Sequence, residues 1–200
     1  MSARSPAAAP IEAAFYDRPV VEVARDLIGC VVSYDRCSGV IVETEAYHDS
    51  EPACHAFVGL TPRTETLFGP PGVAYVYRSY GVHAMLNAVS EHEGVGAAVL
   101  IRALEPLEGI ERMAARRGFP PDQVRALCSG PGKLTQALGI WLDLNGSSLQ
   151  RGPIVISPAG AEWEGVEVDA GRRIGLTKAV ELPWRFTVRG SRFLSAPLRR

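Results

Sequence analysis

The stretch CVVSYDRCSGVIVETEAY, residues 30–47, decides the fold. Its two runs rich in β-branched residues, CVVSY and GVIVETEAY, flank the turn-prone DRCSG, and this pattern is typical of a β-hairpin. A second hairpin is predicted over 73–89, where VAYVYRSY is followed by GVHAMLNAV with Gly81 near the tip, and AAVLIRAL at 97–104 predicts a further strand. A mainly antiparallel sheet is therefore expected.

Helices are expected beside this sheet. Apolar residues at helical spacing follow Pro19, and Gly29 is placed to end that helix. Ser129 is placed to cap a later helix. The other expected elements are helices over 107–117, 122–127 and 131–139 and short strands around 153–156, 166–175 and 184–189.

The chain shows neither an internal repeat nor a linker that would divide it. The predicted fold class is therefore α+β: a single mixed domain over residues 15–200, with a curved, mainly antiparallel β-sheet flanked by helices. Residues 1–14 lack usable periodicity and are expected to form a disordered N-terminal tail.

Composition excludes a membrane protein and a disulfide scaffold. No run reaches the roughly 18 to 20 apolar residues that span a bilayer, so a cytoplasmic protein is expected. The 4 cysteines among 200 residues form no CxxC pair, which favours reduced thiols over a zinc site.

The net charge of −1 conceals a basic C-terminal segment. Residues 172–200 hold eight basic residues and one acidic residue. This segment either contacts phosphates or balances the acidic remainder of the chain. Arg185, Arg189 and Arg192 are the candidate phosphate-binding residues, and any of them that pairs with an acidic residue instead would affect stability more than affinity.

VETEAY at 42–47 is the first chemical signal. Side chains alternate along a strand, so Glu43, Glu45 and Tyr47 share one face. Two carboxylates beside a phenol suggest a site, and a solvated acidic edge strand is the alternative.

YVYRSYG at 75–81 is the second signal. Tyrosines interleaved with an arginine at a hairpin tip suit a platform that stacks on bases. Tyr75 and Tyr77 share a face, whereas Tyr80 lies at the turn and is able to project as a wedge. Aromatic core packing is the alternative.

Three further polar residues stand out. Arg102 and Asn87 each lie in an otherwise apolar strand and need partners or a cavity, because an unpaired buried polar group is costly. His55 by itself is more typical of an ordinary loop histidine.

Together these stretches resemble the alkyladenine (3-methyladenine) DNA glycosylase family, in a compact bacterial form. The matching pieces occur in family order from about residue 15 to 195. They are FYDRPVVEVARDLIG, IVETEAY, the histidine of ACHAF, TPR followed by FGPPGVAYVYRSYG, the asparagine of MLNAVS, VLIRALEPLEG, CSGPGKLTQALGI and RFTVRGSRFLS.

The resemblance implies a base-excision repair enzyme that flips an alkylated or deaminated purine out of duplex DNA and hydrolyses its N-glycosidic bond. The implied base is 3-methyladenine, with 7-methylguanine, hypoxanthine and ethenoadenine as further candidates. Glu45 is implied as the general base that activates the water, Arg102 as a ligand of that water and of the adjacent phosphate, and the Ile174 carbonyl as a further water ligand.

The resemblance also implies roles for the aromatic residues. Tyr47, His55 and Tyr77 would sandwich the flipped base, and Asn87 would obstruct the exocyclic amine of normal guanine. Tyr80 would fill the vacated stack from the minor groove, with Val82 beside it.

Such hydrolysis implies no metal and no organic cofactor. No Schiff-base lysine is evident, since Lys133 and Lys178 are the only lysines and neither lies in a catalytic motif, so a monofunctional glycosylase is favoured. The expected partner is damaged double-stranded DNA, bound by a monomer. A non-catalytic damaged-DNA or RNA binding module and a nucleoside hydrolase are the alternatives.

Overall fold

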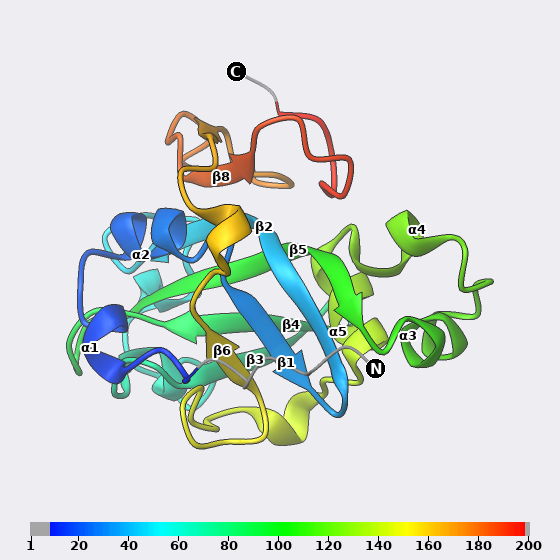
Figure 1. Cartoon of the computed structure of the whole chain (residues 1–200). Coiled ribbons are helices and arrows are strands. Elements are labelled where there is room, and N and C mark those ends of the chain that lie inside the picture. The colour runs from blue at the N-terminus through cyan, green and yellow to red at the C-terminus, as the bar shows by residue number, and fades with distance from the viewer. Residues whose placement is uncertain (1–8, 199–200) are drawn as a thin grey trace.

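Two long strands, β2 (Cys37–His48) and β5 (Ala97–Glu108), pair at the centre of the sheet in the computed structural model, which describes residues 9–198 (Figure 1). The strand order is β3-β4-β5-β2-β1-β6, and every pairing among the described strands is antiparallel. The remaining strands of this path are β1 (Val31–Tyr34), β3 (Ala74–Ser79), β4 (His83–Val89) and β6 (Val155–Ser157). The expected mixed α+β class is confirmed.

One edge of β2 is shared between two partners. Its first residues pair with β1, whereas Glu43, Thr44 and Glu45 pair with β8 (Arg185–Val188), which in turn pairs with β7 (Val168–Gly171). Register shifts between Ile41 and Thr44 mark a β-bulge against β5. The segment that holds both glutamates is therefore enclosed by β5 on one side and β8 on the other.

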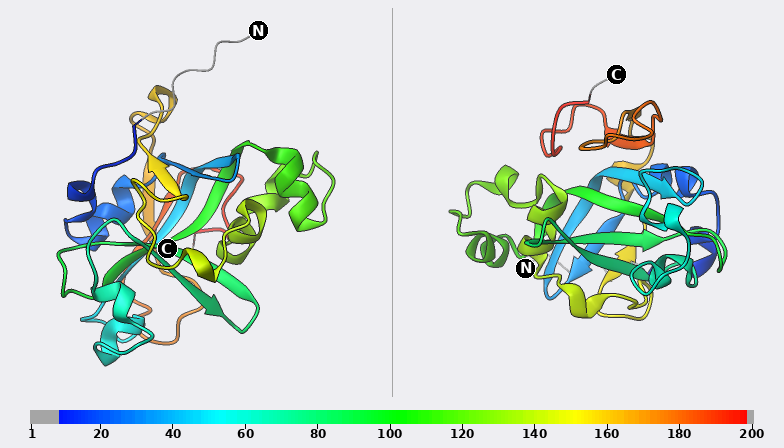
Figure 2. Two further views of the ribbon diagram at one scale, coloured as in Figure 1. Left: turned by 90° about the horizontal axis from the view of Figure 1, so that it is seen from below. Right: turned by 180° about the vertical axis from the view of Figure 1, so that it is seen from behind.

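Helices cover the sheet at two places, and Figures 1 and 2 show them at opposite ends of the molecule. Helix α2 (Val20–Asp26) packs on β2 and β5, next to the short α1 (Ala13–Tyr16). Helix α5 (Pro131–Leu138) packs on β4 and β5, with α3 (Ile110–Arg117) and α4 (Val124–Cys128) beside it.

Both predicted hairpins are confirmed, and both tips place two successive residues at positive φ, which are Asp35 and Arg36 in the β1–β2 turn. The β3–β4 turn places Tyr80 at φ +48° and Gly81 at φ +71°, so two successive residues adopt the left-handed conformation typical of a tight hairpin turn. The long loop between the hairpins contains two short 3₁₀ helices, η1 (His55–Val58) and η2 (Glu65–Phe68).

Some predicted boundaries were wrong. Strand β5 continues to Glu108, four residues beyond the predicted end, because it stays paired with the start of β2, and α3 begins correspondingly later. Ser129 does not cap α5: the N-cap is Gly130, and no side chain caps this helix.

The fold also begins earlier than predicted. Residues 1–8 of the expected tail lie outside the described residues, but Ile11 is buried and its N–H donates to the Ile156 carbonyl at 2.9 Å. Helix α1 follows from Ala13. An apolar side chain and a strand-edge carbonyl therefore order residues that periodicity alone left unassigned.

The four cysteines are all buried and free, as expected for reduced thiols. Among residues 9–198, no helix is long and apolar enough to cross a membrane.

Candidate active site

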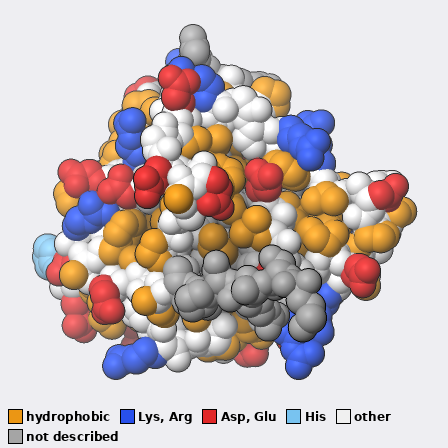
Figure 3. Space-filling model, viewed as in Figure 1, with side chains coloured by type: hydrophobic (Ala, Val, Ile, Leu, Met, Phe, Trp, Pro, Cys, Tyr) orange, Lys and Arg blue, Asp and Glu red, His pale blue; other side chains and the backbone are white. Residues whose placement is uncertain are grey.

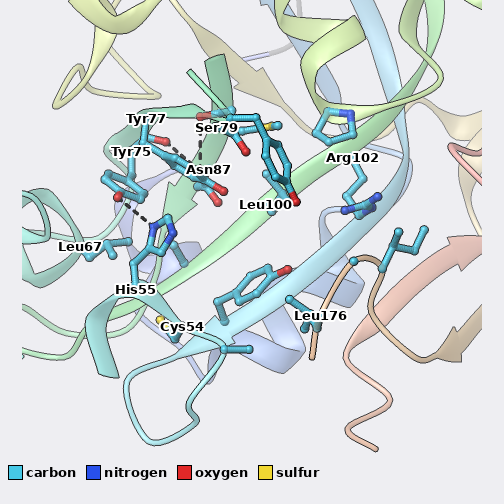
Figure 4. Close-up of a pocket in the computed structure, with 18 residues that line it drawn as sticks. Cys54, His55, Leu67, Tyr75, Tyr77, Ser79, Asn87, Leu100, Arg102 and Leu176 are labelled. Carbon is cyan, nitrogen blue, oxygen red and sulfur yellow. Dashed lines mark hydrogen bonds between the residues drawn. The ribbon is translucent and has the colours of Figure 1, made fainter. Parts of the chain in front are cut away.

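A cavity of about 430 Å³ opens between the β3–β4 hairpin, η1 and the central strands (Figure 4). Tyr75, Tyr77 and His55 lie at its aromatic end, and Arg102 marks the opposite, polar end (Figure 4). The sequence-predicted residues that line it are Tyr47, His55, Tyr77, Tyr80, Asn87, Arg102 and Ile174. Seven residues spread over 128 positions of sequence are thus brought to one place.

Tyrosine and histidine rings form one wall of the cavity. Tyr75 and Tyr77 stack with their centroids 5.3 Å apart, and the His55 ring meets Tyr77 edge-on at 4.6 Å. His55 Nδ1 lies 3.2 Å from the Tyr75 hydroxyl, as drawn in Figure 4. Burial, together with the charge of Arg63, lowers the pKa of His55, so this wall is uncharged at neutral pH.

Tyr47 belongs to a different part of the cavity. The guanidinium of Arg173 lies 4.6 Å from the centre of the Tyr47 ring and pairs with Glu51 at 2.7 Å. Burial, and next the charge of Glu45, raises the pKa of Tyr47 well above its ordinary value. The phenol therefore keeps its proton and acts as a donor.

Glu45 lies directly behind the polar end of the cavity and is fully buried. Its carboxylate accepts three hydrogen bonds, from the Tyr47 hydroxyl at 2.8 Å, from Arg102 Nη1 at 3.1 Å and from the Ile174 N–H at 2.7 Å. All three donors line the cavity. Burial raises the pKa of Glu45 and outweighs the opposing effect of Arg102.

Arg102 connects Glu45 to a second buried carboxylate, because its Nε donates to Glu43 Oε1 at 2.9 Å. Burial alone would lower the pKa of Arg102, but the two glutamates reverse this effect and raise it. The shared face predicted for Glu43, Glu45 and Tyr47 is confirmed, and it faces the interior rather than solvent.

Asn87 is held in one orientation. Its Nδ2 donates to the Tyr75 carbonyl at 3.0 Å, and the side chain is buried while still lining the cavity. Tyr80 has the opposite environment: it lies at the hairpin tip with 92% of its surface exposed. An exposed aromatic ring at the mouth of an aromatic cavity is available to a large partner.

The basic C-terminal segment divides into three environments. Arg185 is 1% exposed and pairs with Glu43 at 2.9 Å, so its predicted phosphate contact is wrong: a side chain committed to a buried carboxylate does not reach DNA. Arg189 is exposed and pairs with Asp169 and Glu167, the intramolecular alternative that the sequence left open.

Arg192 lies in a separate cleft of about 470 Å³. Arg125 and Lys133 line the same cleft, together with Ser129 and a single acidic residue, Asp122. Lys133 is in the first turn of α5, two residues after Pro131, which lines the aromatic cavity. The cleft is thus next to the candidate active site along this helix.

Sequence reasoning missed three residues. The charge of Arg63 helps to lower the pKa of His55, and the guanidinium of Arg173 lies over the Tyr47 ring. Ser195 donates a hydrogen bond to Glu43. Arg63 follows Pro62 in the matched TPR piece, so its motif was visible although its role was not. Among residues 9–198, no group of three or more His, Cys, Asp or Glu side chains is arranged to hold a metal ion.

Comparison with known proteins agrees with this geometry. The model of the methylpurine-DNA glycosylase family matches residues 14–192. The chain belongs to this family. The resemblance found in the sequence motifs is therefore confirmed, and residues from several of these motifs line one cavity of this methylpurine-DNA glycosylase.

Individual relatives of this glycosylase are similar over nearly their whole length. A protein of Bradyrhizobium diazoefficiens is 57% identical over 94% of this chain and 92% of its own, and one of Rhodopseudomonas palustris strain BisB18 is 52% identical over 94% and 91%. A protein of Methanoculleus marisnigri is 50% identical over 92% of this chain and 98% of its own. Each is named "Putative 3-methyladenine DNA glycosylase".

Proposed function

We propose that this chain flips methylated purines, 3-methyladenine first among them, out of duplex DNA and hydrolyses the N-glycosidic bond with a water activated by Glu45. The arrangement around Glu45 carries the proposal: a buried carboxylate, with a raised pKa, bonded to three groups that line an aromatic cavity. Buried carboxylates with perturbed pKa values beside a cavity are typical of catalytic sites.

The aromatic wall suits the base that is removed. An alkylated purine carries positive charge, which the faces of Tyr47 and Tyr77 attract and which a neutral His55 does not repel. The tight position of Asn87 in the cavity wall supports its proposed role against the exocyclic amine of guanine.

The groups that act on the sugar lie at the polar end of the cavity. Glu45, ionised, takes a proton from the attacking water, and its negative charge stabilises the cationic sugar that develops in the transition state. Arg102 holds the carboxylate in place and is near the phosphate of the flipped nucleotide in this proposal. The Ile174 carbonyl remains a proposed ligand of the water, while its N–H is used by Glu45.

DNA is the proposed substrate rather than a free nucleoside because of Tyr80. An exposed ring on a tight turn suits insertion into a base stack, whereas a free nucleoside offers no stack to fill. Glu45 likewise argues against a binding module without chemistry, because a fully buried carboxylate is costly and a module that only stacks on bases does not need one.

Phosphate contacts are proposed for the cleft formed by Arg125, Lys133 and Arg192. The face seen in Figure 3 carries interspersed acidic and basic side chains, which does not favour a polyanion. The cleft, in contrast, gathers three cations next to the aromatic cavity.

The reaction is proposed to be hydrolytic without a lyase step, since neither Lys133 nor Lys178 lines the aromatic cavity. Incubation with duplexes that carry one 3-methyladenine or one hypoxanthine tests the proposal. Release of free base with an abasic site, and without strand cleavage, is expected. Tight binding without released base would support the binding module instead.

A further inference from the structure

Glu43 is the most heavily bonded carboxylate near the cavity, although it does not line it. It is fully buried and accepts from Arg102 Nε and Arg185 Nε at 2.9 Å each. Ser195 adds two more hydrogen bonds, from its N–H at 2.6 Å and from its hydroxyl at 2.7 Å. A carboxylate with this many donors is fixed in position.

Ser195 also contacts Arg102, whose Nη2 donates to the serine hydroxyl at 3.3 Å. Each nitrogen of the Arg102 guanidinium therefore has its own partner: Nε has Glu43, Nη2 has Ser195 and Nη1 has Glu45. A guanidinium is planar and rigid, so fixing two of its nitrogens also fixes the direction of the third.

Strand and loop geometry explains why these residues meet. Glu43 and Glu45 share one face of β2, and Arg102 reaches both of them from β5. Arg185 lies on β8 and forms an ion pair with Glu43. It also donates to the Pro197 carbonyl at 3.3 Å, and this bond holds the segment that carries Ser195 in place. The C-terminal segment lies above the end of the sheet in Figure 1 and, from behind, in Figure 2.

We propose that Glu43 and Ser195 are positioning residues for the glycosylase reaction, which hold the Arg102 guanidinium so that its Nη1 is directed at Glu45. This inference rests on the proposed function, because it assigns Arg102 and Glu45 to the reaction. Glu43 does not touch the substrate: it acts through Arg102.

Ser195→Ala tests the proposal without removing a buried charge. It deletes the hydroxyl bonded to both Glu43 and Arg102 and leaves the backbone bond in place. The single-turnover excision rate is expected to fall about tenfold, because small misplacement of reacting groups is costly, while the Kd for lesion-containing duplex stays within about twofold. Ser195→Thr restores the hydroxyl and is expected to restore the rate.

Ser191→Ala is the matched control. Ser191 lies in the same segment, but its hydroxyl accepts from the Phe193 N–H and lies outside the Arg102 network. The same chemical change there is expected to leave the excision rate unaltered. An equal loss in both serine variants would overturn the proposal, because it would assign the effect to the segment as a whole.

Glu43→Gln supplies a second readout. The groups that act on the charge of Glu45 are Arg102 from β5, the Ile174 N–H, and Tyr47 and Glu43 on its own strand. Because Glu43 raises the pKa of Glu45, its neutralisation is expected to shift the acid limb of the rate to lower pH. A purely structural Glu43 would lower thermal stability and leave the pH profile unmoved.

The outcomes separate the two proposals. A wild-type protein that releases no base from methylpurine duplexes overturns the proposed function, and this inference with it. An active wild type with unchanged rates in Ser195→Ala and an unmoved pH profile in Glu43→Gln overturns the positioning role alone.

Discussion

The Tyr47 hydroxyl donates a hydrogen bond of 2.8 Å to Glu45 Oε2, which ties a residue of the proposed base sandwich to the proposed general base. The two residues are one pleat apart on β2, so the strand itself sets their relative position. Substrate stacking and water activation thereby depend on one rigid element, and their coupling is measurable.

Tyr47→Phe is expected to move the acid limb of the excision rate to higher pH. Burial raises the pKa of Glu45, so the wild-type rate is lost as pH falls through a value above the ordinary one for a carboxyl group. The Tyr47 hydrogen bond opposes this shift, and its removal raises the pKa further. The acid limb is measured with single-turnover rates between about pH 4 and 8, a range that spans the ordinary pKa values of carboxyl groups and of histidine.

Tyr77→Phe is the control for this shift. Tyr77 contributes ring contacts with Tyr75 and His55 rather than one of the three hydrogen bonds that Glu45 receives. An acid limb that moves equally in both variants would show that the phenol of Tyr47 has no special link to Glu45.

Glu45→Gln is expected to abolish excision and preserve binding. The amide keeps the volume of the side chain but lacks the basic oxygen and the charge that stabilises the cationic sugar. The excision rate is therefore expected to fall by about 10²–10⁴-fold or more. Released base and the Kd for lesion duplex are measured in parallel, with thermal unfolding as the check that the variant is folded. Substantial turnover in the variant would exclude Glu45 as the general base.

The sequence predicted the parts of this site that depend on short-range patterns. Alternation along one strand was enough to place Glu43, Glu45 and Tyr47 on one face, and the turn residues were enough to place Tyr80 at a hairpin tip. The basic segment was predicted less well, because which arginine is buried depends on which strand pairs with β2. Arg185 lies opposite Glu45 in that pairing, a contact across 140 positions of sequence that no local pattern encodes.

Tyr80→Ala is expected to impair excision from paired duplex far more than from single strands. The ring is 92% exposed, so its removal leaves no core cavity, and a single strand has little stacking to disrupt. Tyr80→Phe keeps the ring and is expected to retain activity. Rates on both substrates measure the effect, and equal losses on the two would argue against a wedge.

Asn87→Ala is expected to increase the release of undamaged guanine relative to the wild type. Removing one obstructing group from a pocket is worth about 1–3 kcal/mol, or at least about a tenfold change in selectivity. Guanine released from undamaged duplex is compared with 3-methyladenine released by the same variant. If the rate of guanine release stays at the wild-type level, Asn87 has only a structural role, which is its hydrogen bond to the Tyr75 carbonyl.

The last prediction concerns how a protein of net charge −1 holds a polyanion. Arg125, Lys133 and Arg192 line one cleft beside the aromatic cavity, whereas Arg189 already pairs with Asp169 and Glu167. Each phosphate that a cation neutralises releases counterions, so each lost contact flattens the plot of log affinity against log salt by roughly 0.9. Replacing the three cleft residues with Gln is therefore expected to weaken binding to damaged and undamaged duplex by similar factors and to flatten this slope. Arg189→Gln makes the same change at a paired arginine and is expected to leave the slope near that of the wild type. A slope that flattens in Arg189→Gln but not in the cleft variant would show that the phosphate contacts lie near β7 and β8 instead of in the cleft.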